Sequence, residues 1–149
     1  MTIRYTHTNI VSTDWKKLAA FYIEVLDCRP VPPERNLSGK WLDQGTGVKS
    51  ASIEGMHLRL PGFGDSGPTL EIFQYERIER NYPPKANRKG FGHLAFHVDN
   101  VEEIKKKVIS YGGGSLGEIT KKEVPGVGLL TFVYMTDPEG NILELQNWS

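Results

Sequence analysis

Hydrophobic and polar residues follow the same pattern in two separate stretches of the chain. Residues 5–14 and 90–100 each contain a histidine, a mostly apolar strand pattern and an acidic or amide residue suited to cap a helix. An amphipathic helix is predicted after each stretch, because apolar residues recur at three- and four-residue spacing. These apolar positions are Leu18, Phe21, Tyr22, Val25 and Leu26 in the first helix and Val101, Ile104, Val108 and Ile109 in the second.

Strand patterns follow each helix, and the last strand of each half contains one carboxylate. Residues 51–60 and 69–75 are predicted to pair as a hairpin around a turn at 61–68, and the second of these strands contains Glu71. Residues 115–124, 129–136 and 142–146 are also predicted as strands, and the last contains Glu144. Residues 29–50, with several Pro and Gly, are predicted to form an irregular loop in which Trp41 is either a lid or a core anchor.

The two halves therefore repeat one order of elements: a strand, a helix and three further strands. We predict a single domain over residues 1–149, with a first module at 1–80, a linker at 81–89 and a second module at 90–149. Such a repeat indicates that one site is assembled from two copies of the same unit.

Composition narrows the class of protein. The chain has 38% hydrophobic and 24% charged residues, which is ordinary for a soluble protein, and its 18 basic and 18 acidic residues give no basic surface for nucleic acid. No apolar run approaches the ~20 residues of a membrane span, and the N-terminus has no apolar signal region. The single cysteine, Cys28, cannot form an internal disulfide, so we expect a cytoplasmic protein in which Cys28 is structural.

Four residues of the repeat, His7, Glu71, His93 and Glu144, are candidate metal ligands. Each Glu lies between two apolar residues of a strand, so it points to the other face of the sheet, where an unpartnered carboxylate would be costly to bury. A cation would remove that cost. Two imidazoles and two carboxylates suit one divalent ion, namely Zn²⁺, Ni²⁺ or Co²⁺, with Mn²⁺ and Fe²⁺ also compatible.

The other histidines have weaker patterns. His97 follows His93 by four residues on the same strand face, where it would support a ligand, be exposed or lie in the core, and His57 is given no role. Residues expected on or near the strands of a substrate pocket are Trp41, Arg59, Phe73, Tyr134 and Trp148.

At these residues the sequence resembles the vicinal oxygen chelate superfamily, which includes glyoxalase I, methylmalonyl-CoA epimerase, bleomycin-resistance proteins and extradiol dioxygenases. The resemblance covers almost the whole chain and rests on His7 with Asp14, on 92–93 with 98–100, and on 137–141 before the strand with Glu144. It implies an α+β fold in which two βαβββ modules form a curved, open eight-stranded mixed sheet around a metal site.

The four candidate ligands match those of the glyoxalase I and epimerase branches. The resemblance implies a divalent-metal-dependent lyase, isomerase or epimerase that abstracts a proton next to the metal-bound carbonyl of a small substrate, with Glu144 as the base. Glu54 is a second acid–base candidate, because epimerisation needs two opposed groups. The resemblance also implies a homodimer. The alternatives are a non-catalytic protein that binds a small molecule or antibiotic, and a metal-dependent dioxygenase.

Overall fold

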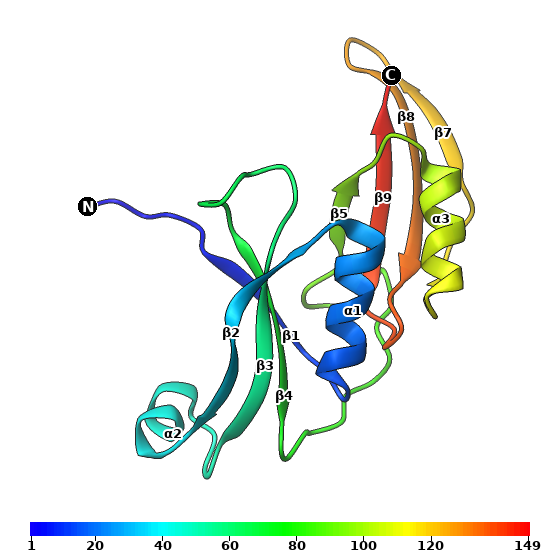
Figure 1. The fold of residues 1–149 in the computed structure, drawn as a ribbon. Helices are drawn as coiled ribbons and strands as arrows, with labels where there is room; N and C mark the ends of the chain where they lie inside the picture. The colour runs from blue at the N-terminus through cyan, green and yellow to red at the C-terminus, as the bar shows by residue number, and fades with distance from the viewer. The chain divides into compact units, whose positions relative to one another are not determined.

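Two mixed α+β units, Met1–Arg80 and Asn81–Ser149, make up the chain in a computed structural model that describes residues 1–149 (Figure 1). Each unit contains one sheet, and the longest helix of the unit packs on the two inner strands. The predicted α+β class with two strand–helix–strand modules is therefore confirmed.

The first unit has a four-stranded sheet in the order β1-β4-β3-β2. Its strands are β1 (His7–Val11), β2 (Arg29–Ser38), β3 (Ser52–Arg59) and β4 (Thr69–Tyr75), and its helices are α1 (Trp15–Leu26) and α2 (Lys40–Thr46). β1 runs parallel to β4, whereas the other neighbouring strands are antiparallel. Glu71 on β4 therefore lies between two other strands.

The second unit has the same connectivity around a five-stranded sheet. Its elements are β5 (Leu94–His97), α3 (Val101–Ser110), β6 (Gly114–Ser115), β7 (Thr120–Val124), β8 (Gly128–Thr136) and β9 (Ile142–Trp148). β5 runs parallel to β9, β9 is antiparallel to β8, and both β6 and β7 pair with β8. Glu144 on β9 thus has the same place among its neighbours as Glu71 has on β4.

Helix α1 forms where the apolar periodicity predicted it. The Asp14 side chain caps its first turn by accepting a hydrogen bond from the backbone N–H of Lys17 at 3.1 Å. The helix ends at Asp27, which adopts a left-handed conformation with φ 53°. All five predicted apolar residues of this helix are buried, and a fully buried Leu or Phe side chain contributes about 1.5–3 kcal/mol.

Helix α3 confirms its predicted cap and departs from its predicted apolar face at one position. The Asn100 side chain accepts a hydrogen bond from the N–H of Glu103 at 3.1 Å. Val101 and Val108 are buried, but Ile109 is 49% exposed, so its assignment to the apolar face was wrong. The reason is geometric: Ile109 directly follows Val108 and is rotated about 100° away from it around the helix axis.

Alternation along the inner strands divides each sheet into a helix-covered face and an opposite face. Leu70 and Ile72 are fully buried beside Glu71, and Leu143 and Leu145 are fully buried beside Glu144. Because neighbouring strand residues point to opposite faces, both carboxylates point away from the face on which their apolar neighbours are buried.

The segment 29–50 is more regular than predicted. It contains β2, which pairs with β3 through a register shift between Val31 and Arg35, followed by helix α2. Prolines are tolerated because β2 is an edge strand, where missing N–H groups leave no partner unsatisfied. Leu42 of α2 packs with Ala51 and Ile53, whereas Trp41 is 61% exposed and is not a core anchor.

The sheets contain nine strands in total, four in the first unit and five in the second, where eight were predicted. The extra strand arises because the predicted strand at 115–124 is divided into β6 and β7. Leu116 and Gly117 both donate their backbone N–H to the carbonyl of Tyr134, which interrupts the regular ladder between the two short strands.

The turn before β9 is organised by one buried carboxylate, Asp137. It accepts hydrogen bonds from the N–H of Glu139, the N–H of Asn141 and the side-chain amide of Asn141, at 2.8 to 3.0 Å. Gly140 occupies the left-handed region with φ 91° that the turn requires. This turn fixes the pairing of β8 with β9 and hence the neighbours of Glu144.

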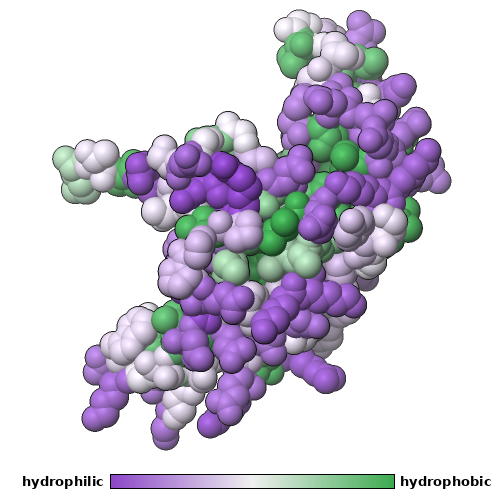
Figure 2. Space-filling model, viewed as in Figure 1, coloured by the Kyte–Doolittle hydropathy of each residue, from purple (hydrophilic) through white to green (hydrophobic).

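Figure 2 shows one face of the molecule coloured by hydropathy. Around α2, the face of the first unit seen in Figure 2 is mostly hydrophilic, with small hydrophobic areas among polar residues. None of the three helices is both long and apolar enough to cross a membrane.

Candidate functional site

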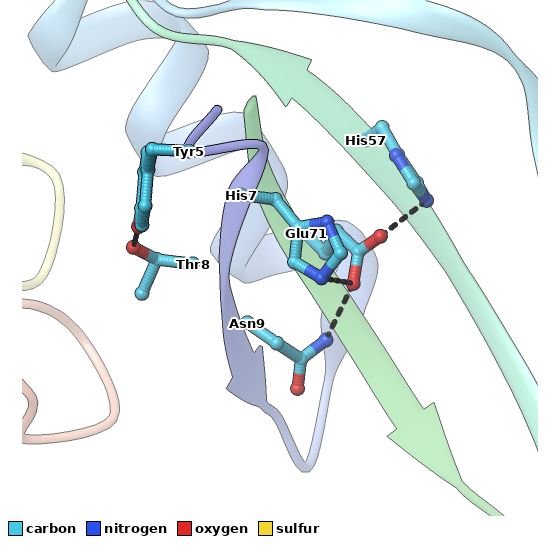
Figure 3. Close-up of polar contacts among 6 residues, drawn as sticks. All are labelled: Tyr5, His7, Thr8, Asn9, His57 and Glu71. Carbon is cyan, nitrogen blue, oxygen red and sulfur yellow. Dashed lines mark hydrogen bonds and ion pairs between the residues drawn. The ribbon is translucent and has the colours of Figure 1, made fainter. Parts of the chain in front are cut away.

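Glu71 is the buried polar centre of the first unit, and three side chains surround its carboxylate (Figure 3). His57 Nε2 lies 2.9 Å from Glu71 Oε1, and His7 Nε2 lies 3.3 Å from Glu71 Oε2. The side-chain amide of Asn9 also donates to Oε2, at 3.3 Å. These contacts offset the cost of burying a carboxylate in a residue that is only 7% exposed.

Strand register accounts for this arrangement. Asn9 lies opposite Glu71 on the parallel strand β1, and His57 lies opposite Glu71 on the antiparallel strand β3. His7 precedes Asn9 by two residues and so points to the same face. Pairing of β4 with both neighbours is therefore sufficient to bring the three side chains to one carboxylate.

Burial favours the neutral form of the His57 imidazole. Burial lowers the pKa of His57 from its ordinary value of 6.5, and this effect outweighs the Glu71 carboxylate, which raises the pKa. The positive charge of Arg35 lowers the pKa further. Since Nε2 faces a carboxylate oxygen, we assign the single ring hydrogen of the neutral imidazole to Nε2, which donates it to Glu71.

The second unit contains a simpler pair, His93 and Glu144. His93 Nε2 lies 2.9 Å from Glu144 Oε2, and both side chains are partly exposed. Glu144 lies opposite Ala95 on β5 and opposite Tyr134 on β8. The ring of Tyr134 lies 4.7 Å from the ring of His93, centroid to centroid, but no hydrogen bond joins Tyr134 to Glu144.

The two pairs occupy equivalent positions in their units. In each unit the histidine precedes by two residues the position on the first strand that lies opposite the glutamate. The structure therefore brings His7 to Glu71 and His93 to Glu144, and the single metal site expected from all four residues stays a prediction. The surroundings differ, because Asn9 and His57 of the first unit are replaced by Ala95 and Tyr134 in the second.

His57 is the site residue that the sequence analysis missed. The predicted hairpin came within one residue of showing it: a turn over 61–68 pairs Leu60 with Thr69 and places His57 opposite Ile72, whereas pairing of Leu60 with Pro68 places His57 opposite Glu71. The structure has this register, with Leu60 N–H donating to the carbonyl of Pro68 at 3.2 Å.

Glu54 is not brought to the Glu71 carboxylate. It lies opposite Gln74, and this pair is three residues away from the His57–Glu71 pair on each strand. Because strand residues alternate between faces, an odd separation places Glu54 on the other face of the sheet. There it lines a cavity of about 380 Å³ together with Ser52, Gln74, Tyr75 and Glu76. The role of Glu54 as a second acid–base group beside Glu144 stays a prediction.

Two of the predicted pocket residues, Arg59 and Trp148, have local hydrogen bonds. The Arg59 guanidinium donates to the carbonyl of Gly67, which holds the β3–β4 turn, and Trp148 Nε1 donates to Gln146 Oε1 at 2.9 Å. His97 is exposed opposite Gln146.

Cys28 is buried, and burial raises the pKa of its thiol from 9.0 to about 12, with the Asp27 carboxylate adding to the effect. No reactive thiolate therefore forms at neutral pH.

The donor atoms of each pair fit a divalent metal, although neither unit holds a complete metal cage. Imidazole nitrogen and carboxylate oxygen are ligands that Zn²⁺, Ni²⁺ and Co²⁺ accept. No group of three or more His, Cys, Asp or Glu side chains is arranged to hold a metal ion. In the first unit the two imidazoles lie on different oxygens of Glu71, so they do not converge on one point.

Each unit has a strand–helix–strand order and a histidine beside a glutamate of its last strand. This repeat defines a class of proteins that are built from two copies of one module. Residues 4–145 match the Glyoxalase/Bleomycin resistance protein/Dioxygenase superfamily, and the chain belongs to this family. Members of this superfamily commonly bind a divalent metal. No curated protein sequence matches the chain.

Solved structures show the same fold at low sequence identity. A glyoxalase family protein from Bacillus cereus superimposes with a TM-score of 0.85 at 19% identity, covering 99% of this chain and 95% of the other. A glyoxalase/bleomycin resistance protein/dioxygenase family enzyme from Burkholderia phytofirmans PsJN gives 0.61 at 15% identity, covering 97% and 98%. A glyoxalase family protein from Enterococcus faecalis gives 0.60 at 23% identity, covering 96% of each chain.

Proposed function

We propose that this protein is a divalent-metal-dependent lyase or isomerase that moves a proton at the carbon next to a carbonyl group of a small substrate. The observation that carries the proposal is the repeated pair: His7 with Glu71 and His93 with Glu144, in the same register in both units. Two such pairs supply two nitrogen and two oxygen donors for one ion, either within one chain or by pairing units of two chains.

The ion supplies Lewis acidity, which stabilises negative charge on the carbonyl oxygen and is worth several kcal/mol. The chain's own residues supply the ligands and the base. His7, His93 and Glu71 hold their donor atoms in place, and Glu144 accepts the proton and returns it to the same or the neighbouring carbon. Glu144 has one donor beside it, His93, whereas Glu71 has three. A carboxylate with fewer hydrogen bonds is easier to move, which supports Glu144 as the base.

The first test is metal content, measured by elemental analysis after reconstitution with Ni²⁺, Co²⁺ or Zn²⁺. We expect about one ion per chain in the native protein and its loss in the double variant His7→Ala, His93→Ala, which removes one ligand from each pair. The matched control, His97→Ala, changes an exposed histidine at the end of β5, four residues after His93, and should retain the ion. A native protein that binds no ion under any of these conditions would overturn the proposal.

The second test is chemical. Substrate mixtures of α-ketoaldehyde–thiol adducts, and of acyl-CoA thioesters with a stereocentre next to the carbonyl, are incubated in D₂O. Proton movement by Glu144 should introduce deuterium at that carbon or at the neighbouring one, which NMR detects even when the equilibrium favours the starting compound. Metal binding without exchange on either substrate class would instead favour the non-catalytic binding protein or the dioxygenase, and Fe²⁺ reconstitution with a catechol separates those two.

A further inference from the structure

We propose that His57 is a positioning residue, which fixes the Glu71 carboxylate so that one defined oxygen is presented to the metal. The inference rests on the proposed function, because it assigns the neighbours of one of its ligands. His57 is not itself assigned as a ligand or as a catalytic residue.

The contacts of the two carboxylate oxygens carry the inference. His57 Nε2 lies 2.9 Å from Glu71 Oε1, whereas His7 Nε2 and the side-chain amide of Asn9 each lie 3.3 Å from Glu71 Oε2. His57 thus occupies one oxygen with the shortest of the three contacts. The other oxygen remains next to His7, the residue proposed to share the ion with it.

His57 is held firmly enough to act in this way. It lies directly opposite Glu71 in an antiparallel ladder (Figure 3). Its side chain is 21% exposed, and its ring is 5.6 Å from the ring of Phe73, centroid to centroid. A strand position restricts the side chain more than a loop would, and an orienting hydrogen bond to a metal-binding carboxylate is worth about 10–100-fold in metal affinity.

The second unit provides an internal comparison. Tyr134 is the register equivalent of His57, since it lies opposite Glu144 on the strand that pairs with β9. It makes no hydrogen bond to Glu144, whose only ion-pair partner is His93. The Glu71 carboxylate is therefore held by a side chain of the neighbouring antiparallel strand, whereas the Glu144 carboxylate is not. This difference assigns Glu71 as the permanent ligand.

The test measures metal affinity of the full-length chain by isothermal titration of metal-free protein with Co²⁺ and Zn²⁺. Four variants are compared with the native protein: His57→Leu, His57→Gln, His57→Asn and His97→Leu. Gln places an amide donor at about the reach of imidazole Nε2, whereas Asn carries the same amide one methylene shorter. His97→Leu makes the same chemical change at an exposed position.

We expect His57→Leu and His57→Asn to bind about 10–100-fold more weakly, and His57→Gln and His97→Leu to bind within about threefold of the native protein. The visible spectrum of bound Co²⁺ should change in His57→Leu and be restored in His57→Gln. The Gln and Asn pair keeps the test decisive if the Leu variant fails to fold, because both keep a polar group at position 57.

Each outcome has one meaning. Metal affinity that is unchanged in His57→Asn, in a native protein that binds the ion, would overturn the role of His57 and leave the proposed function standing. Affinity lost equally in His57→Gln and His57→Asn would also overturn it, because His57 would then be a ligand itself. No binding by the native protein would overturn the proposed function, and the inference with it.

Discussion

Glu71 and Glu144 occupy equivalent strand positions but have different numbers of donors around them. Glu71 has His7, Asn9 and His57, whereas Glu144 has His93 alone. Each hydrogen bond restrains the position of the carboxylate. Two carboxylates of one repeat can therefore take different roles, one as a fixed ligand and the other as a movable base.

This difference gives a prediction for the two matched substitutions Glu144→Gln and Glu71→Gln. We expect Glu144→Gln to abolish deuterium exchange into substrate, with a loss of at least about 10²-fold, while a substantial fraction of the metal stays bound. Glu71→Gln should instead lose most of the metal, because it removes the ligand with the largest number of supporting contacts.

Metal content and exchange rate are measured on the same preparation of each variant. If Glu144→Gln exchanged deuterium at the native rate, Glu144 would not be the base. If both variants lost metal equally, the distinction between fixed and movable carboxylate would fail.

At the scale of elements, caps and turns determine where the site residues fall. Asp14 begins α1 and Asn100 begins α3 by the same side-chain hydrogen bond to a backbone N–H. The turns before β4 and β9 set the registers that place His57 opposite Glu71 and Tyr134 opposite Glu144. Local signals in the sequence thus define where elements begin and end, and pairing defines which side chains meet.

Loss of the hydrogen bond that caps α1 should lower the free energy of unfolding by the contribution of that one hydrogen bond. Asp14→Ala removes the acceptor for the N–H of Lys17, and we expect a loss of about 1 kcal/mol in the free energy of unfolding, within a range of about 0.5–2 kcal/mol. Urea denaturation followed by circular dichroism measures it. Glu24→Ala, an exposed substitution in the same helix, is the control and should change stability by less than about 0.5 kcal/mol. Equal effects would show that the cap contributes nothing specific.

At the scale of the whole molecule, β1 and β5 each form an open edge of their sheet. β1 pairs only with β4, and β5 pairs only with β9, so each has one side free for hydrogen bonding. Exposed apolar side chains lie at or near these strands, among them Tyr5, Val11 and Phe91. Open edges with exposed apolar side chains favour pairing with another chain.

We therefore propose that the protein forms a homodimer. Light scattering after size-exclusion chromatography should give about twice the 16.8 kDa of one chain at micromolar concentration. Val11→Lys places a charge on β1 and should shift the mass toward one chain. A native protein that elutes with the mass of one chain at these concentrations would contradict the proposal.

Much of the fold and of the candidate site could be read from local patterns. The apolar periods predicted α1 and α3, and alternation in the strands predicted that Glu71 and Glu144 face away from their buried neighbours. The segment 29–50 was missed because its prolines and glycines indicate a loop by composition, whereas the edge position of β2 tolerates them. Propensity says nothing about whether a strand lies at an edge.

The sequence by itself determined the family and the repeated order of elements, because these depend on motifs and periodicity within short stretches of the chain. Only the tertiary structure decided the neighbours of each carboxylate: His57 and Asn9 at Glu71, and Tyr134 and Ala95 at Glu144. The physical reason is that pairing of β1 with β4 and of β5 with β9 joins residues about 50 to 60 positions apart, and burial across the whole sheet selects that register.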